Sequence, residues 1–285
     1  MSKILDPPFR WNLASQNHIG RLAEGEKAHV YDEFFEHVLP CCAKILSFAG
    51  DCDLLFVGRS PESIFDHLSG LLFDTSWSDR ISLLQFSMRY VDEKSISRES
   101  IEGIRSYMHK LDLHPDGLSA RERPVAFIDL VASGETFGRL ITLLYNWANE
   151  VQADWNAVKR RVRLIGITER TKTSPKTWRW QQHVSWRHLL TQSAIKNVSI
   201  PRELWLYLGN TQEKVTKSFT PRRWADPRTA KPNYDEEHLR ALRLALEVFE
   251  SGRTEGRREK FASLLVKETA MKHAWFRQLA QEVRS

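Results

Sequence analysis

The amino-acid sequence predicts an α/β fold with a parallel sheet at its centre. Short apolar runs at 53–58, 81–86, 124–131 and 161–167 have the length and composition of strands that are buried on both faces. Segments with apolar residues at helical spacing separate these runs, and such alternation is typical of right-handed βαβ units. With 41% apolar and 11% aromatic residues in 285 positions, the chain can build a packed core.

The first 50 residues are expected to combine loop and helix. Apolar residues recur close to a 3.6-residue period between Glu24 and Leu46, which predicts an amphipathic helix with Cys41 and Cys42 on its packing side. Together with Cys52, these cysteines form neither a disulfide framework nor a C-x-x-C zinc pair. This cysteine usage indicates a reducing compartment, and the expected location is cytoplasmic.

The strand expected at 53–58 leads directly into a helix. It ends at Gly58, and Ser60 and Pro61 follow. Serine can cap a helix and proline is favoured at the first helical position, so residues 53–73 are expected to form a strand, a tight glycine turn and a helix.

The rest of the α/β region continues in the same way. Residues 98–111 are expected to be helical, 114–121 to form a loop, and the strand at 124–131 to lead into another helix. In parallel sheets, ligands bind in loops that leave the carboxyl ends of strands. Two such loops are therefore candidate ligand-binding loops, at 58–61 and at 129–136.

The C-terminal part of the chain has a different character. Residues 168–186 are rich in Thr, Lys, Arg and Trp, and residues 199–235 hold four prolines and are expected to be irregular. Helical spacing of apolar residues returns between 235 and 284. A break at Ser251 and Gly252 divides this last part into two or three predicted helices.

The chain is expected to divide into three segments. They are a helical and loop segment at 1–50, the α/β core at 51–170 and a basic, Trp-containing, helical C-terminal region at 171–285. Residues 1–150 carry 22 acidic and 15 basic side chains, whereas residues 151–285 carry 14 and 27. The basic half could bind an anionic partner, which could be nucleic acid, a phosphorylated metabolite or an acidic protein. In the alternative interpretation, its basic residues only form a solvent-exposed helical surface.

No membrane association is expected from the hydropathy of the chain. Its apolar runs are all far shorter than the roughly 20 residues that cross a bilayer. The segment from Met1 to Trp11 contains prolines and charges in place of an apolar stretch, so we expect no signal peptide there.

The loop at the end of the strand at 124–131 combines groups that suit a phosphorylated ligand. Asp129 ends the buried run, and Ser133, Gly134, Glu135 and Thr136 lead into the next helix. A helix start offers free N–H groups and a partial positive charge, and glycine lets the backbone approach a phosphate closely. In the alternative interpretation, this is an ordinary turn in which Ser133 caps the helix and Glu135 offsets its dipole.

The segment from 125 to 136 resembles the signature of the type I phosphoribosyltransferases that binds 5-phosphoribosyl 1-diphosphate (PRPP). That signature is an apolar strand and two acids, followed by a Thr-Gly-x-Thr loop. Without gaps, Asp129 falls on the second acid, and Ser133, Gly134 and Thr136 fall on the loop positions. The resemblance implies that Asp129 is a catalytic residue that binds the ribose hydroxyls. It also implies that all four residues from Ser133 to Thr136 hold the 5′-phosphate.

Two positions depart from this signature. Ile128 stands where the family has its first acid, and Ala132 stands where the family often has Asp or Thr. Loss of one acid implies weaker ribose binding or a different ligand, so catalysis and binding without catalysis both stay open.

The earlier loop is similar to the pyrophosphate loop of the same family. Gly58, Arg59 and Ser60 follow a strand and precede the PRPP-like loop along the chain, in the family's order. Over residues 50–170, the resemblance implies transfer of phosphoribose to an acceptor, with pyrophosphate leaving and Mg²⁺ bound with PRPP. It also implies a homodimer, since type I relatives are commonly dimers.

Three functional hypotheses follow. The leading one is a phosphoribosyltransferase-like enzyme or nucleotide-binding protein; the second is a regulator that binds PRPP or a nucleotide without catalysis. The third is a nucleic-acid-binding protein whose affinity comes from the basic half, with binding that falls steeply as salt rises. Magnesium-dependent PRPP binding separates the first two from the third.

Other residue clusters give weaker signals. Trp178, Trp180 and Trp186 could stack on an acceptor base, or they belong to the core or an interface. His183 and His188 match no zinc pattern, so we expect no protein-held metal site.

Overall fold

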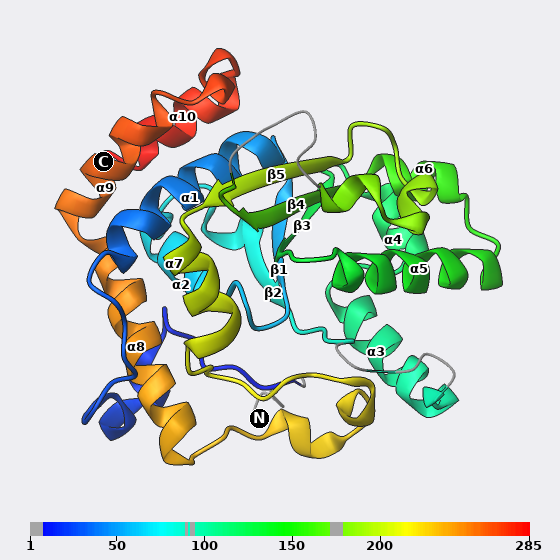
Figure 1. The fold of residues 1–285 in the computed structure, drawn as a ribbon, viewed down its shortest axis with the longest axis horizontal. Helices are drawn as coiled ribbons and strands as arrows, with labels where there is room; N and C mark the ends of the chain where they lie inside the picture. Colours follow the sequence, from blue (N-terminus) through cyan, green and yellow to red (C-terminus); the bar gives the residue numbers. More distant parts are fainter. Residues whose placement is uncertain (1–7, 89–90, 92–94, 172–178) are drawn as a thin grey trace.

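The computed structural model describes residues 8–88, 91, 95–171 and 179–285. Within these residues, five parallel strands form one sheet in the order β2-β1-β3-β4-β5. The strands are β1 (Asp53–Val57), β2 (Ile81–Leu84), β3 (Val125–Leu130), β4 (Val162–Glu169) and β5 (Ile195–Ile200). Helices cover both faces of this sheet, as Figure 1 shows. The predicted α/β class with a parallel sheet is therefore confirmed.

One face of the sheet is covered by helices from both ends of the chain (Figure 1). Leu54, Phe56 and Ile128 lie on this face and are fully buried among them. These helices are α1 (Phe34–Ala49), α2 (Glu62–Leu71), α7 (Arg202–Leu206), α8 (Glu236–Arg253), α9 (Glu255–Leu265) and α10 (Ala274–Glu282).

The opposite face is covered by helices from the middle of the chain. Leu55, Val57 and Phe127 alternate with the residues of the first face and are buried here, as expected of strands whose side chains point in turn to either side. These helices are α3 (Arg98–Lys110), α4 (Pro115–Ala120), α5 (Glu135–Glu150) and α6 (Trp155–Arg160).

Short helical turns complete the secondary structure. A π-helical turn at Tyr207–Thr211 follows α7 directly. The described 3₁₀ turns are Gln16–His18, Gly20–Ala23, Ser78–Arg80, Trp180–Gln182, Ser185–Leu189, Pro221–Arg223, Pro227–Ala230 and Thr269–Lys272.

The strand order creates a crevice at the carboxyl ends of β1 and β3. These two strands are neighbours, but the chain leaves β1 for α2 on one face and leaves β3 for α5 on the other. Because the two connections diverge, the space between them is the place where sheets of this kind bind ligands. The loops at 58–61 and 131–134 border it.

The helix expected from Glu24 to Leu46 begins later, at Phe34, and continues to Ala49. Gly25 has a φ of +113°, a conformation that a helix cannot contain. The Arg243 side chain donates a hydrogen bond to the Glu26 carbonyl at 2.9 Å, which fixes this stretch in an extended path over α8.

Four of the helices and strands were not expected from the sequence, and one of them, α7, lies in the stretch expected to be irregular. The predicted loop at 114–121 contains the short helix α4, which starts with Pro115 at its first position. Helix α6 precedes β4, and β5 closes one edge of the sheet. β5 has the sequence Ile-Lys-Asn-Val-Ser-Ile, whose polar residues hide it from a search for apolar runs.

The predicted break at Ser251 and Gly252 is misplaced, although three C-terminal helices are present in the described chain. α8 continues through Gly252 and ends at Arg253. A Cβ atom at Gly252 would lie 2.6 Å from the carbonyl oxygen of His67 in α2. The glycine therefore serves close packing of two helices, and the helix boundary is at Thr254.

The N-terminal segment is held against α2 and α8. Phe9, Trp11 and Leu13 pack in a cluster with apolar residues of α8. The Arg10 guanidinium donates to both carboxylate oxygens of Asp66 at 2.7 Å. No helix in the described residues combines the length and apolar character needed to cross a membrane.

Candidate functional site

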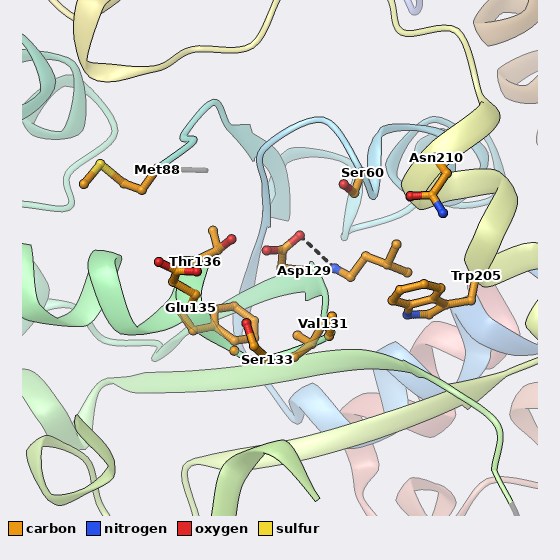
Figure 2. A pocket seen from close by; sticks show the side chains of 14 residues that line it. Ser60, Met88, Asp129, Val131, Ser133, Glu135, Thr136, Trp205 and Asn210 are labelled. Atoms are coloured by element: carbon orange, nitrogen blue, oxygen red, sulfur yellow. Dashed lines mark hydrogen bonds between the residues drawn. The ribbon is translucent and has the colours of Figure 1, made fainter. Parts of the chain in front are cut away.

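A cavity of about 290 Å³ opens at the carboxyl ends of β1 and β3, where the strand order predicts a ligand site. It takes residues from the loops after both strands and from the turn after α7 (Figure 2). The lining residues are Ser60, Met88, Asp129, Leu130, Val131, Ala132, Ser133, Gly134, Glu135, Thr136, Phe137, Trp205, Gly209 and Asn210.

Asp129 is the buried carboxyl group of this cavity. Its side chain is 5% exposed and accepts a hydrogen bond from the Leu130 N–H at 2.7 Å. Burial raises the pKa of Asp129 to about 8, although hydrogen bonds from the Leu130 N–H and the Thr136 hydroxyl act to lower it. The carboxyl is therefore largely protonated at neutral pH and can donate a hydrogen bond as well as accept one.

Gly134 is the N-cap of α5 and has the left-handed conformation, with φ at +81°. Within the described residues, no side chain caps this helix. The interpretation in which Ser133 caps α5 is thus wrong, although Glu135 does lie in the first turn, where it pairs with Arg139 at 3.3 Å. Ser133 is exposed instead and faces the cavity (Figure 2).

The start of α5 gives the cavity a positive end. α5 has 16 residues, and its first N–H groups follow Gly134 directly. Aligned peptide dipoles place about half a positive charge at such a terminus. Together with the hydroxyl groups of Ser133 and Thr136, this arrangement suits the oxygens of a phosphate group.

The loop before α5 rests on a tryptophan. A Cβ atom at Gly134 would lie 2.3 Å from Cε3 of Trp180, so the indole ring contacts the glycine backbone. The Trp180 Nε1–H donates to Oδ1 of Asn197 at 2.8 Å, and Trp180 is 3% exposed. Trp180 is therefore a core residue and not a free stacking surface. Trp178 lies outside the described residues.

The loop after β1 contributes to the same cavity through one of its three predicted residues. Ser60 lines the cavity, whereas Gly58 and Arg59 are not among the described lining residues. Gly58 has a φ of +70°, and a Cβ there would lie 2.9 Å from the carbonyl oxygen of Phe86. The Arg59 guanidinium donates to the carbonyl oxygen of Thr216 at 3.2 Å.

A buried polar network fixes this loop from behind. Glu62, the first residue of α2, is 2% exposed and accepts hydrogen bonds from Thr216 Oγ1 at 2.7 Å and Gln85 Nε2 at 3.3 Å. Burial lowers the pKa of Lys214 to about 8, while Glu62 acts to raise it. The network joins the start of α2 to residues 214–216, which follow the π-helical turn after α7.

Sequence reasoning missed the wall opposite the two loops. Trp205, Gly209 and Asn210 come from α7 and the π-helical turn, in a region expected to be irregular (Figure 2). Met88 follows β2 and lines the cavity as well. None of these residues belongs to a motif, so the sequence alone carries no signal for them.

Ile128, which stands at the first acid position of the PRPP signature, points into the core and not into the cavity. Its side chain is fully buried in the core on the α2 face of the sheet. Asp129, the next residue, lines the cavity. Position 128 is thus a core position, and Asp129 is the carboxyl group that the end of β3 presents to the cavity.

A magnesium ion would need ligand oxygens to bind here. The described residues contain no cluster of three or more His, Cys, Asp or Glu side chains that could hold a metal. Mg²⁺ is commonly bound through one or two carboxylates and the phosphates of a substrate. Asp129 fits that pattern, provided that a phosphorylated ligand supplies the remaining oxygens.

Basic side chains of the C-terminal half are partly used inside the protein. Arg257 and Lys260 of α9 both pair with Glu36 of α1, and they lower its pKa. Arg240 pairs with Glu213 at 2.9 Å. This part of the charge excess stabilises contacts between distant segments, and binding of nucleic acid or an acidic partner stays a prediction.

Comparison with models of protein families, with curated proteins and with solved structures found no match. The resemblance to phosphoribosyltransferases therefore depends on two loops of this chain. Both loops lie at the same edge of the sheet, and each contributes to one cavity.

Proposed function

We propose that the protein binds a phosphorylated sugar, either PRPP or a nucleotide, in the cavity between the β1 and β3 loops. One observation carries this proposal: Asp129 and the uncapped start of α5 line the same small cavity at the strand-order crevice. A phosphoribosyltransferase-like core is the fold that we infer from this arrangement.

The phosphate group belongs at the start of α5. Ser133 and Thr136 supply hydroxyl groups, and the backbone N–H groups after Gly134 supply further donors. The left-handed Gly134 lets the backbone turn toward the ligand without a side chain in the way.

The sugar belongs beside Asp129. A carboxyl with a pKa of about 8 can donate to a hydroxyl oxygen when protonated and accept from a hydroxyl when ionised. Binding of a cation or of hydroxyl donors would favour the ionised form, so ligand binding and proton release are expected to be coupled.

Transfer of phosphoribose is the finer form of the proposal. The bond between the anomeric carbon and the pyrophosphate oxygen would break, an acceptor would bond to that carbon, and pyrophosphate would leave. Asp129 would orient the ribose, and Ser60 in the loop after β1 would contact the departing group. Bound with PRPP, Mg²⁺ would reduce the charge of the leaving pyrophosphate.

A second candidate function is binding without transfer. Ile128 lies in the core where the family has its first acid, so ribose would contact a single carboxylate. A regulator that senses PRPP or a nucleotide needs affinity but not the first acid of the signature.

Calorimetric titration with PRPP, with and without Mg²⁺, tests the binding proposal. Asp129→Asn is expected to weaken binding at least about tenfold, the effect of roughly one lost hydrogen bond to a charged group. Asp116→Asn, an exposed carboxylate in α4, is the matched control and is expected to bind as the wild type does.

The absence of PRPP and nucleotide binding at both magnesium conditions would refute the proposal. If binding is present, release of pyrophosphate during an acceptor screen distinguishes the enzyme from the regulator.

A further inference from the structure

A second cavity lies on another side of the sheet, between the edge strand β2 and the N-terminal segment. It has a volume of about 530 Å³ and shares no lining residue with the cavity at Asp129. α2, α8 and the C-terminal part of α3 complete its walls. The lining residues are Pro8, Arg10, Trp11, Asn12, Leu13, Ala14, Phe65, Asp66, Ser69, Phe73, Asp74, Ser78, Asp79, Ile81, Leu83, Gln85, Tyr107 and Phe249.

Aromatic rings and carboxylates dominate the chemistry of this cavity. Five aromatic side chains line it, and three aspartates stand against one arginine. The rings present electron-rich faces that attract cations, and the surplus of carboxylates favours positive charge. An anionic ligand would meet a net negative wall.

The protein already places cations on these rings. The Arg10 guanidinium lies 5.5 Å from the centre of the Phe65 ring while it pairs with Asp66. The Arg253 guanidinium lies 4.2 Å from the centre of the Phe73 ring. Guanidinium groups therefore fit the geometry of this wall.

Several acceptor groups of the cavity have no partner within the part of the chain that the structure describes. Asp74 and Asp79 are exposed, and neither has an ion pair among the residues that the structure describes. Gln85 is 3% exposed, and its Oε1 atom has no hydrogen-bond partner there. The Gln85 amide is oriented by Glu62, because its Nε2 donates to that carboxylate. Oε1 is thus left as an acceptor for an N–H donor.

We infer that this cavity binds an organic cation with N–H donors, of the guanidinium or primary ammonium class. Asp74 and Asp79 attract the cationic group at the entrance, Gln85 offers it a buried acceptor, and the aromatic side chains form the apolar wall around it. This site is independent of the PRPP cavity, so either proposal can fail without the other.

Calorimetric titration of the full chain with agmatine at low ionic strength tests the inference. Agmatine carries a guanidinium and an ammonium group. 4-Guanidinobutanoate is the matched probe, because it keeps the guanidinium and replaces the ammonium by a carboxylate. We expect agmatine to bind more tightly, by about tenfold or more, since the exposed carboxylates attract its ammonium group and repel the carboxylate of the other probe.

The double variant Asp74→Asn and Asp79→Asn is expected to weaken agmatine binding about tenfold. Asparagine tolerates the positive φ of +62° at position 74, so the fold should persist. Asp129→Asn lies in the other cavity and is expected to leave agmatine binding unchanged. Undetectable agmatine binding, equal affinity for the two probes, or wild-type affinity in the double variant would each overturn the inference.

Discussion

The indole ring of Trp180 lies directly against the backbone of Gly134, and a Cβ at that glycine would be 2.3 Å from Cε3 of the ring. A residue of the C-terminal region thus forms the support of the loop that begins α5. Position 134 therefore requires glycine for two reasons. Its φ of +81° is unfavourable for other residues, and a Cβ atom would clash with the Trp180 ring.

Gly134→Ala is expected to distort this loop and to lower the free energy of unfolding by about 2 kcal/mol or more, because the left-handed conformation and the clash both oppose a side chain. PRPP binding should fall with it. Gly256→Ala in α9 is the matched control, since nothing lies within 4 Å of a Cβ there. That control is expected to be neutral or slightly stabilising in urea denaturation. Equal stability of the two variants would contradict the assigned role of Trp180.

Asp129 makes stability depend on pH in a defined direction. Its pKa of about 8 in the folded protein lies above the ordinary value of 3.8, so the folded state retains a proton that the unfolded state loses. Between about pH 4 and pH 8, this group therefore lowers stability as pH rises, by up to about 1.4 kcal/mol per pH unit.

Asp129→Asn removes that contribution. Urea denaturation at pH 5, 6, 7 and 8 should show the variant gaining stability relative to the wild type as pH increases. Other titrating groups, such as Asp66, are present in both proteins and cancel in the difference. A constant difference across this range would mean that Asp129 ionises normally.

The buried pair of Arg10 and Asp66 gives a third prediction. Burial raises the pKa of Asp66 to about 7, and Arg10 limits that rise. Arg10→Met is expected to cost about 3 kcal/mol of unfolding free energy at pH 8, since it leaves a buried carboxylate unpaired. The cost should shrink below pH 7, where Asp66 is protonated in both proteins. A second substitution, Asp66→Leu, should recover most of the loss at pH 8.

The three cysteines are expected to be inert in the folded protein. Cys41, Cys42 and Cys52 are free and buried, and burial raises the pKa of Cys41 to about 12 and of Cys52 to about 11. Thiolate is the reactive form, so a thiol reagent should react only after unfolding. Titration with and without denaturant measures this, and rapid reaction of any thiol in the native protein would contradict the assigned burial.

Much of the sheet could be predicted because its three central strands, β1, β3 and β4, are largely buried on both faces. Strands of this kind appear in a sequence as continuous apolar runs. The strand predicted at 53–58 agrees with β1 to within one residue. β5 pairs with one neighbour only and carries Lys196, Asn197 and Ser199, so its pattern is that of a loop. β2, the other edge strand, has the mostly apolar sequence Ile-Ser-Leu-Leu and was predicted, so the polar composition of β5 is what concealed it.

The sequence indicated the lining residues on only one side of the cavity. Asp129 and the residues from Ser133 to Thr136 lie close together along the chain, at the end of a strand and the start of a helix, which is a pattern that can be recognised in the sequence. Trp205 and Asn210 reach the cavity because α7 packs against β4 and the turn after α7 lies close to Leu130 at the end of β3. This is a tertiary relationship with no local pattern. The same holds for Trp180, whose support of Gly134 depends on contacts between distant segments.

A crystal structure of the protein with PRPP and Mg²⁺ tests the central claim most directly. We expect density for the 5′-phosphate at the start of α5, for ribose beside Asp129, and for pyrophosphate at the Ser60 loop. Density for PRPP in another cavity, or an empty site at saturating PRPP, would contradict the account.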